Sequence, residues 1–261
     1  PPLLWKIILY LFVLPFRPAR SARLYARIWD GKSFPLIRHT ERLAQVMNAE
    51  HAFLLSSPRL GDVFDKWERE GLPDKLLVVP LFPQYSEATT ASVLDVWGHE
   101  VKKRAVVPEF HFVRDFHRSR AFIDGGVRRI REAGVTDVVV SFHGIPKRRV
   151  LIKKDPYYRH CWETFVLLKR QLPEFNLHFT FQSRFGSEEW LTPYTDAYVE
   201  GLIKGGTRKI AVYCPSFVSD CLETTDEIGH ELAHAAREWG GEVLHVPCLN
   251  DDPTWVADFS G

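Results

Sequence analysis

The sequence predicts an α/β protein of two similar domains, each with a parallel sheet flanked by helices. Short apolar runs rich in β-branched residues alternate with stretches of helical periodicity, an order typical of parallel sheets covered by helices. Segments 76–90 and 211–225 also share the order strand, Pro, loop, helix at an offset of 135 residues. Their identities are Pro80 and Pro215, Phe82 and Phe217, Thr89 and Thr224, and Thr90 and Thr225. Such an internal echo indicates two related halves.

The strands and helices can be placed in chain order from their apolar patterns. Buried strands are predicted at 76–82, 135–144, 177–183, 208–217 and 242–250. Helices are predicted at 120–134, 160–172 and 194–206, and the last of these ends on Gly205-Gly206, a helix stop signal.

The boundary between the two halves is placed near residues 108–117. We expect an N-terminal domain over 1–112, a C-terminal domain over 113–238, and a final segment, 239–261, that packs back on the first domain. The echo is asymmetric, because Ala88 stands in the first half where Glu223 stands in the second. The second domain is therefore expected to carry the chemistry.

Composition narrows the functional classes. The chain of 261 residues is 45% hydrophobic, which is enough for a sizeable core. Its 34 Lys and Arg are balanced by 33 Asp and Glu, so nucleic acid is not an expected partner. The four cysteines, Cys161, Cys214, Cys221 and Cys248, show no C-x-x-C spacing, which favours reduced thiols in a cytoplasmic protein.

The apolar run from Leu3 to Leu14 is too short to span a bilayer, which takes roughly 20 such residues. It also lacks the basic start and small-residue cleavage site of a signal peptide. Two interpretations stay open: a helix in the core, or a helix lying at a membrane surface with Trp5, Tyr10 and Phe12 at the interface.

Two chemically capable side chains fall at the ends of predicted strands. His143 directly follows the apolar run VVVSF, and Glu223 follows the strand at 208–217 after a short loop. Ligands of open α/β sheets bind beyond the carboxyl ends of strands. A lone histidine there is more often structural, but a histidine and a glutamate at two such ends of one domain favour a site.

The segment from Leu222 onward carries a second signal. In an α-helix successive side chains advance by about 100°. The residues that would then share one face are Glu223, Glu227, His230, Glu231 and His234, opposite Ile228, Leu232, Ala235 and Ala236. A solvated amphipathic helix is one interpretation, although carboxylates four residues apart repel one another. The alternative of a zinc metallopeptidase through His230-Glu231-Leu232-Ala233-His234 is disfavoured, because no third ligand stands on a separate element.

Several motifs together resemble the ferrochelatase family, in its proteobacterial type. They are PLFPQYSEATTAS (80–92), SFHGIPKR (141–148), DPYY (155–158), FQSRFG with WLTPYTD (181–196), PSFVSDCLETTDEI (215–228) and PCLND (247–251). The resemblance implies two Rossmann-like domains with a porphyrin cleft between them. It also implies insertion of Fe(II) into protoporphyrin IX, the last step of haem biosynthesis, with release of two protons.

The resemblance also assigns residues to roles. His143 and Glu223 match the catalytic pair and, with Glu227 and Glu231, the residues that handle the metal. Tyr157, Phe181, Gln182, Arg184 and Trp190 are similar to residues that form the wall of the porphyrin pocket or support it. Metallation needs a base near the ring and ligands that release Fe(II), for which imidazole and carboxylate are suited. Which of His143 and Glu223 accepts the protons is left open.

The partners and setting follow from the same resemblance. Protoporphyrin IX and ferrous iron are the expected substrates, with no further cofactor. An iron-sulfur cluster is not expected, because no cysteine-bearing C-terminal extension is present. The protein is expected in the cytoplasm, with peripheral contact to the inner membrane through residues 3–14. The family's usual first strand does not precede the apolar run, so a non-catalytic paralogue that binds tetrapyrrole or metal is the competing hypothesis.

Overall fold

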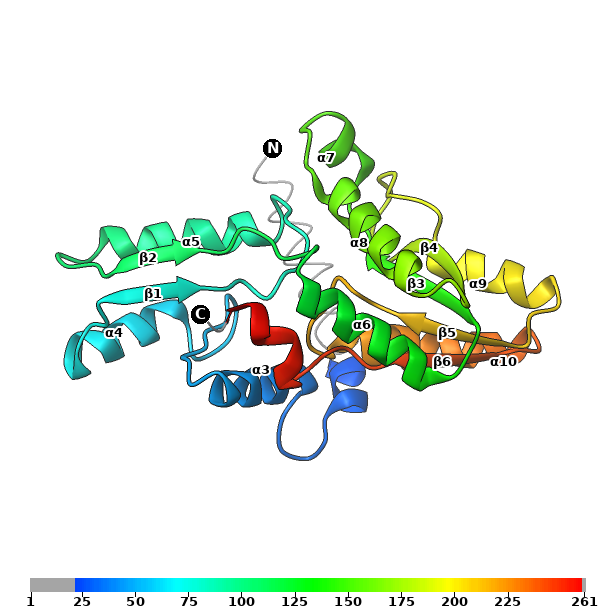
Figure 1. Ribbon diagram of the computed structural model, residues 1–261, viewed down its shortest axis with the longest axis horizontal. Helices are drawn as coiled ribbons and strands as arrows, with labels where there is room; N and C mark the ends of the chain where they lie inside the picture. The colour runs from blue at the N-terminus through cyan, green and yellow to red at the C-terminus, as the bar shows by residue number, and fades with distance from the viewer. Residues whose placement is uncertain (1–21, 260–261) are drawn as a thin grey trace, which may run out of the picture.

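Two parallel sheets organise the chain in the computed structural model, which describes residues 22–259. One sheet has the strand order β1–β2 and the other the order β4–β3–β5–β6, and every pairing is parallel. Figure 1 shows the smaller sheet with α4 and α5 at one end of the molecule and the larger sheet at the other. The predicted fold class is confirmed.

The elements of the first half are short. They are α3 (Pro35–Val46), α4 (Leu60–Glu70), β1 (Lys75–Val78), α5 (Thr90–Lys102) and β2 (Glu109–Phe112). Residues 22–28 are also helical. The predicted boundary at 112 falls at the end of β2, a strand that the sequence reading did not identify.

The second half contains the larger sheet and its helices. They are α6 (Arg120–Ala133), β3 (Asp137–His143), α7 (Lys147–Leu151), α8 (Tyr157–Gln171), β4 (Asn176–Gln182), α9 (Thr195–Lys204), β5 (Lys209–Tyr213), η2 (Leu222–Leu232), α10 (Ala233–Glu238), β6 (Glu242–Val246) and η3 (Pro253–Phe259).

Prolines explain why three strands are shorter than predicted. The runs at 76–82, 208–217 and 242–250 end as β-strands at Val78, Tyr213 and Val246. Pro80, Pro215 and Pro247 follow within two residues, and proline cannot donate a hydrogen bond to the ladder. The chain therefore leaves the sheet early and forms loops where the functional motifs lie.

Both faces of the larger sheet are covered, as the side chains that alternate between its two faces along β3 show. Val138, Val140 and Phe142 pack in a core under α6 and α8, whereas Val139 packs in a second core with α9, η2 and α10. All four side chains are fully buried. Burial on both faces explains why the strand reads as a continuous apolar run.

Residues from Leu222 to Leu232 form a π-helix, which corrects the α-helical geometry assumed from the sequence. A π-helix is closed by bonds between residues five apart, so residues four apart are no longer one full turn apart. Ile228 and Leu232 are buried against the sheet as expected, but Ala235 is only partly buried in α10. The carboxylates and histidines expected on one helical face are therefore divided: Glu223 and Glu227 are half-buried, whereas His230, Glu231 and His234 are exposed.

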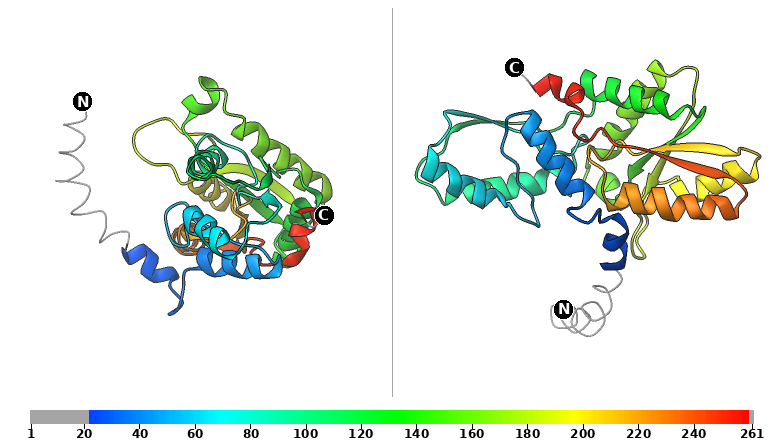
Figure 2. Two further views of the ribbon diagram at one scale, coloured as in Figure 1. Left: turned by 90° about the vertical axis from the view of Figure 1, so that its left-hand side faces the viewer. Right: turned by 90° about the horizontal axis from the view of Figure 1, so that it is seen from below.

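The C-terminal segment was predicted to pack on the first domain, but its strand β6 does not. β6 is instead an edge strand of the larger sheet, paired with β5. η3 packs on α6, as Figure 2 shows for the red C-terminal segment. The segment also contacts the first half: Oδ1 of Asp251 lies 2.7 Å from Nδ1 of His39 in α3, and Trp255 shares a hydrophobic cluster with Leu43. Sequence order alone does not reveal which sheet a last strand joins.

The apolar run at 3–14 lies outside the described residues, so its membrane contact stays a prediction. Within residues 22–259, none of the helices has both the length and the hydrophobicity needed to cross a bilayer.

Candidate active site

His143 and Glu223 are brought to the same edge of the larger sheet. His143 is the last residue of β3 and lies in register with Gln182, the last residue of β4. β5 is the other neighbour of β3, and the chain leaving β5 reaches Glu223 in the first turn of η2. The carboxyl ends of these parallel strands thus place a histidine and a glutamate where α/β sheets bind ligands.

The hydrogen bond of one ring nitrogen sets the tautomer of His143. Its Nδ1 lies 2.6 Å from the carbonyl oxygen of Gly144. Because a carbonyl oxygen can only accept, Nδ1 must carry the proton, and Nε2 of the neutral ring then holds a lone pair. The half-buried imidazole is therefore oriented as a base, with Phe217 packed edge-on at 5.9 Å.

A closed set of three hydrogen bonds holds the backbone of His143. The His143 N–H donates to Ser216 Oγ at 3.2 Å, and the Tyr157 hydroxyl donates to the His143 carbonyl at 2.9 Å. Ser216 Oγ and Tyr157 Oη lie 2.8 Å apart, so the serine hydroxyl can donate to the tyrosine. Burial raises the pKa of Tyr157, which keeps the phenol protonated as a donor.

Glu227 is held by the segment that follows β4. Its carboxylate accepts hydrogen bonds from the backbone N–H of Ser183 at 2.8 Å and from the Ser183 hydroxyl at 2.5 Å. Ser183 has φ 64°, a left-handed conformation that costs on the order of 1 kcal/mol for a residue other than glycine. Burial raises the pKa of Glu227, although the hydrogen bonds from Ser183 oppose this. This carboxyl is therefore poised to exchange a proton more easily than an exposed glutamate.

Glu223 is half-buried at the start of η2, beside Cys221. Its backbone carbonyl accepts a hydrogen bond from Gln182 Nε2 at 2.9 Å, which ties η2 to the end of β4. Burial and the neighbouring Glu223 raise the pKa of the Cys221 thiol, so the thiol stays protonated and can donate to the carboxylate.

Asp220 braces the turn into η2, and the sequence reading did not single it out. It accepts hydrogen bonds from the Thr224 hydroxyl at 2.9 Å and the Asn250 amide at 2.8 Å. Burial opposes its ionisation, yet His245, 3.3 Å away, and Asn250 hold its pKa well below the ordinary value. Asp220 lies inside the motif PSFVSDCLE, but a small acid in a loop has no periodic signature that would reveal such a network.

Two of the residues expected in the wall of the porphyrin pocket or in its support are buried. Phe181 is 1% exposed and packs among Phe142, Tyr158 and Phe179. Tyr157 is 3% exposed and supports His143 from behind. Both side chains face the core in this structure.

The other three expected pocket residues lie at or near the site. Gln182 is buried, and its amide contacts the Glu223 carbonyl and, at 3.4 Å, the Glu227 carboxylate. Arg184 is exposed, stacks 4.3 Å over Tyr194 and forms a two-point ion pair with Asp196. Trp190 packs against Gly144, and its buried indole N–H has no hydrogen-bond partner among the described residues.

The outer residues of the expected stripe face solvent. Glu231 is exposed and lies 3.7 Å from Arg27, which also pairs with Asp226 at 3.2 Å. His230 and His234 are exposed, and His234 lies 3.8 Å from Glu238. Within the part of the chain that the structure describes, no third ligand joins the two histidines. The zinc peptidase interpretation therefore gains no support.

A different group of potential metal ligands lies away from His143. The ligand atoms of Asp115, His117 and His160 all fall within 4.8 Å of one another. The two imidazoles are stacked, however, with ring centroids 3.9 Å apart and planes 8° from parallel. One ion cannot lie in the planes of two parallel rings, so this geometry does not form a metal site. His117 instead bridges Asp115 at 2.7 Å and Glu163 at 2.8 Å.

Known proteins are similar to this chain over most of its length. A family model described as ferrochelatase matches residues 1–260. Ferrochelatase of Herminiimonas arsenicoxydans is 39% identical over 276 residues, covering 98% of this chain and 74% of that protein. Coproporphyrin III ferrochelatase of Streptococcus mutans is 36% identical over 270 residues, covering 98% and 84%.

Solved structures show the same architecture. SirB from Bacillus subtilis with Fe3+ has a TM-score of 0.60 to this chain and 15% sequence identity, covering 85% of this chain and 84% of that one. At that identity the likeness shows the fold alone. The fold is that of the two-domain metal chelatases. By its family model and its relatives, the chain belongs to the ferrochelatase family, whose activity is that of a lyase.

Proposed function

We propose that this chain inserts Fe(II) into protoporphyrin IX to form protohaem, using His143 and Glu223 as its catalytic pair. The observation that carries the assignment of residues is the tautomer of His143. Its Nδ1 is committed to the Gly144 carbonyl, which leaves Nε2 as a proton acceptor at the sheet edge that Glu223 also occupies. General-base catalysis of this kind typically contributes 10² to 10⁴ in rate.

The carboxylates supply the second requirement of the reaction, a route for the metal and for protons. Glu223 and Glu227 are half-buried at the sheet edge, and Glu231 is exposed at the outer end of η2. Oxygen ligands suit Fe(II) and hold it less tightly than thiolates. In this proposal iron passes along η2 toward Glu223 as a substrate, and the protein needs no resident cofactor.

Charge around the site supports protoporphyrin IX over a porphyrin with more carboxylates. Lys147 is paired with Glu189 at 2.5 Å, Arg148 with Glu188 at 2.5 Å, and Arg184 with Asp196 at 2.8 Å. These basic residues on the segments after β3 and β4 already have acidic partners, so they are not free to pair with additional porphyrin carboxylates.

The indole N–H of Trp190, which has no hydrogen-bond partner among the described residues, offers a hydrogen bond to a bound ligand. A buried donor left unsatisfied costs about 1–3 kcal/mol.

The test is anaerobic metallation followed by the shift of the porphyrin Soret band, with protoporphyrin IX and coproporphyrin III compared at equal concentration. Wild type is expected to prefer protoporphyrin IX with ferrous or zinc ion. Glu223→Gln and His143→Asn should each lower the rate at least about 100-fold, because each removes a group that acts on the reacting atoms.

His234→Ala is the matched control, since it changes an exposed residue of the same helical segment. It should metallate at nearly the wild-type rate. A loss as large as that of Glu223→Gln would contradict the assignment. Faster turnover of coproporphyrin III would overturn the choice of substrate, and binding without turnover would favour the non-catalytic paralogue.

A further inference from the structure

Asp155 is a buried carboxylate that contacts both halves of the molecule. It lies in the loop between α7 and α8 and is 7% exposed. Its Oδ2 accepts hydrogen bonds from the Ser86 hydroxyl and the Glu87 backbone N–H, each at 2.8 Å. Its Oδ1 accepts the Tyr157 backbone N–H at 2.9 Å. One oxygen thus binds the first half, and the other binds the first turn of α8.

Tyr157 connects Asp155 to the candidate base. Its ring is buried, its N–H is bound by Asp155, and its hydroxyl donates to the His143 carbonyl. The same hydroxyl contacts Ser216, which accepts the N–H of His143. A movement of Asp155 that shifted the start of α8 would therefore move the support on both sides of His143.

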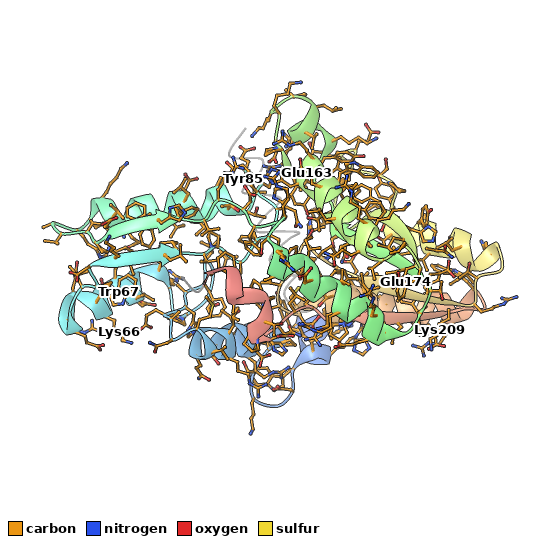
Figure 3. The ribbon with its side chains drawn as sticks, viewed as in Figure 1. Lys66, Trp67, Tyr85, Glu163, Glu174 and Lys209 are labelled. Atoms are coloured by element: carbon orange, nitrogen blue, oxygen red, sulfur yellow. The ribbon has the colours of Figure 1, made fainter. Side chains whose placement is uncertain are left out.

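A second connection runs between the same two regions. Gln84 Nε2 donates to the Pro215 carbonyl at 3.1 Å and to Thr164 Oγ1 at 3.2 Å. Pro215 directly precedes Ser216. The loop of residues 84–87, which we call the first-half loop, is thus attached to the segment that holds His143 at two points. Tyr85 of this loop and Glu163 of α8, both labelled in Figure 3, mark the junction.

Capping of α8 does not account for this arrangement. A side-chain oxygen that accepts the Tyr157 N–H would serve as a helix cap, and asparagine could provide it. The two bonds from Ser86 and Glu87 to the other oxygen are additional, and they need a second acceptor that only a carboxylate supplies. Buried networks of this kind are costly when partly satisfied, so Asp155 holds its partners in one arrangement.

We propose that Asp155 is a positioning residue that couples the first-half loop to His143 through Tyr157. A ligand that shifts the first-half loop then changes the placement of the base. This inference rests on the proposed role of His143, because the coupling matters for catalysis only if His143 acts on the substrate.

The test is a double-mutant cycle on kcat and KM for metallation. Ser86→Ala removes one bond to Asp155, and Tyr157→Phe removes the hydroxyl that holds His143. Ser86 and Tyr157 share Asp155 as a hydrogen-bond partner, each through a different carboxylate oxygen. Each change should lower kcat several-fold with little effect on KM. The loss of kcat in the double variant should be about threefold to tenfold smaller than the product of the two single-variant losses. Asp155→Asn should resemble the double variant.

Glu87→Gln is the control at the same junction. The Glu87 side chain pairs with Lys153 and Arg149 on the surface, whereas its backbone N–H, which binds Asp155, is unchanged. This variant should keep the wild-type kcat. A cycle in which the Ser86 and Tyr157 effects simply multiply would overturn the coupling.

A measurement without porphyrin separates this inference from the proposed function. The ring signals of His143 in NMR should shift in Ser86→Ala and in Tyr157→Phe but not in Glu87→Gln. Unchanged His143 signals in Ser86→Ala would refute the coupling even in an active enzyme. Shifted signals in a protein that does not metallate porphyrin would uphold the coupling and refute the proposed function. The two single variants keep the test decisive if Asp155→Asn does not fold.

Discussion

A single backbone carbonyl decides which nitrogen of His143 can take part in proton transfer. The Gly144 oxygen accepts from Nδ1, and the Gly144 N–H donates to the Gln182 carbonyl at 2.8 Å. Trp190 packs on the other side of Gly144. The position of this glycine therefore couples the tautomer of His143 to the end of the neighbouring strand.

Gly144→Ala tests this coupling. An added Cβ would lie 2.8 Å from the Gln182 carbonyl oxygen and 3.1 Å from Trp190 Cε3, so the backbone must shift. We expect a loss of about 1–3 kcal/mol in the free energy of unfolding, as for overpacked sites. The metallation rate should fall with it, because the shift moves the carbonyl that orients His143. Urea unfolding and the Soret assay measure the two effects.

Gly201→Ala is the matched control, because Gly201 lies inside α9 with no atom within 4 Å of the added Cβ. Alanine should raise stability there by up to about 1 kcal/mol and leave the rate unchanged. If Gly144→Ala behaved in the same way, the close approach would not matter for the site.

At this scale the sequence predicted the residue types better than their orientation. His143 and Glu223 were placed at strand ends by pattern, and the structure brings them to one sheet edge. Tyr157 and Phe181 were expected in the pocket wall or in its support, and both side chains face the core. A motif identifies which residues belong to a site, whereas the direction of each side chain depends on packing that only the fold defines.

His160 of α8 is buried and stacks on His117, which lies in the segment between β2 and α6. Both ring nitrogens of His117 lie against carboxylates, those of Asp115 and Glu163. Burial, and then the neighbouring His117, lower the pKa of His160 to about 4 from 6.5. His160 thus stays neutral in the folded protein, and its Nδ1 accepts the Tyr85 N–H at 3.3 Å.

This difference predicts how stability depends on pH. Between pH 6.5 and about 4 the unfolded chain binds a proton at position 160 that the folded chain does not. The contribution of His160 to the free energy of unfolding is therefore fully present above pH 6.5 and is lost as pH falls through this window. Between pH 7 and pH 5 the free energy of unfolding should fall by about 2 kcal/mol less in His160→Asn than in wild type. Urea unfolding at the two pH values measures this difference.

His234→Ala is the control, since His234 is exposed. Its pH dependence should match that of wild type. An unchanged slope in His160→Asn would mean that His160 binds a proton in the folded state after all.

Helix η2 shows where element prediction from sequence reaches its limit. The amphipathic pattern correctly indicated a helix with Ile228 and Leu232 facing the sheet. It could not distinguish an α-helix from a π-helix, because apolar positions three to five residues apart fit both. The extra residue per turn became visible only with the backbone, and π-segments are frequent at functional sites.

The two halves of the molecule differ in how much core they bury. The larger sheet lies between two hydrophobic cores, and Val138, Val140 and Val212 are fully buried. In the smaller sheet Leu77 is 46% and Phe110 41% exposed. Local stability follows the burial of apolar surface, so the first half is the less stable part.

Native-state hydrogen exchange should show this asymmetry directly. Backbone amides of β1 and β2 are expected to exchange about 100-fold faster than those of β3 and β5, because the smaller sheet opens without disturbing the larger cores. Equal protection of the two sheets would indicate a single cooperative unit.

The alternation of strand and helix along the chain was sufficient to predict the fold class. The strand lengths were overestimated because apolar residues continue past the prolines that end pairing. The position of β6 in the larger sheet was missed for a different reason. The last strand of the chain could join either of the two sheets. Its position depends on pairing between strands, such as β5 with β6, which a local sequence pattern does not show.

The burial of sulfur in the second half has a chemical consequence. All four cysteines are buried, and burial raises the pKa of each thiol, including Cys221 next to Glu223. Alkylating reagents and peroxide attack the exposed thiolate, which these residues do not present while the chain is folded. If ferrous iron passes Glu223 as proposed, the Cys221 thiol beside that glutamate presents no reactive thiolate to the oxidants that iron produces in air.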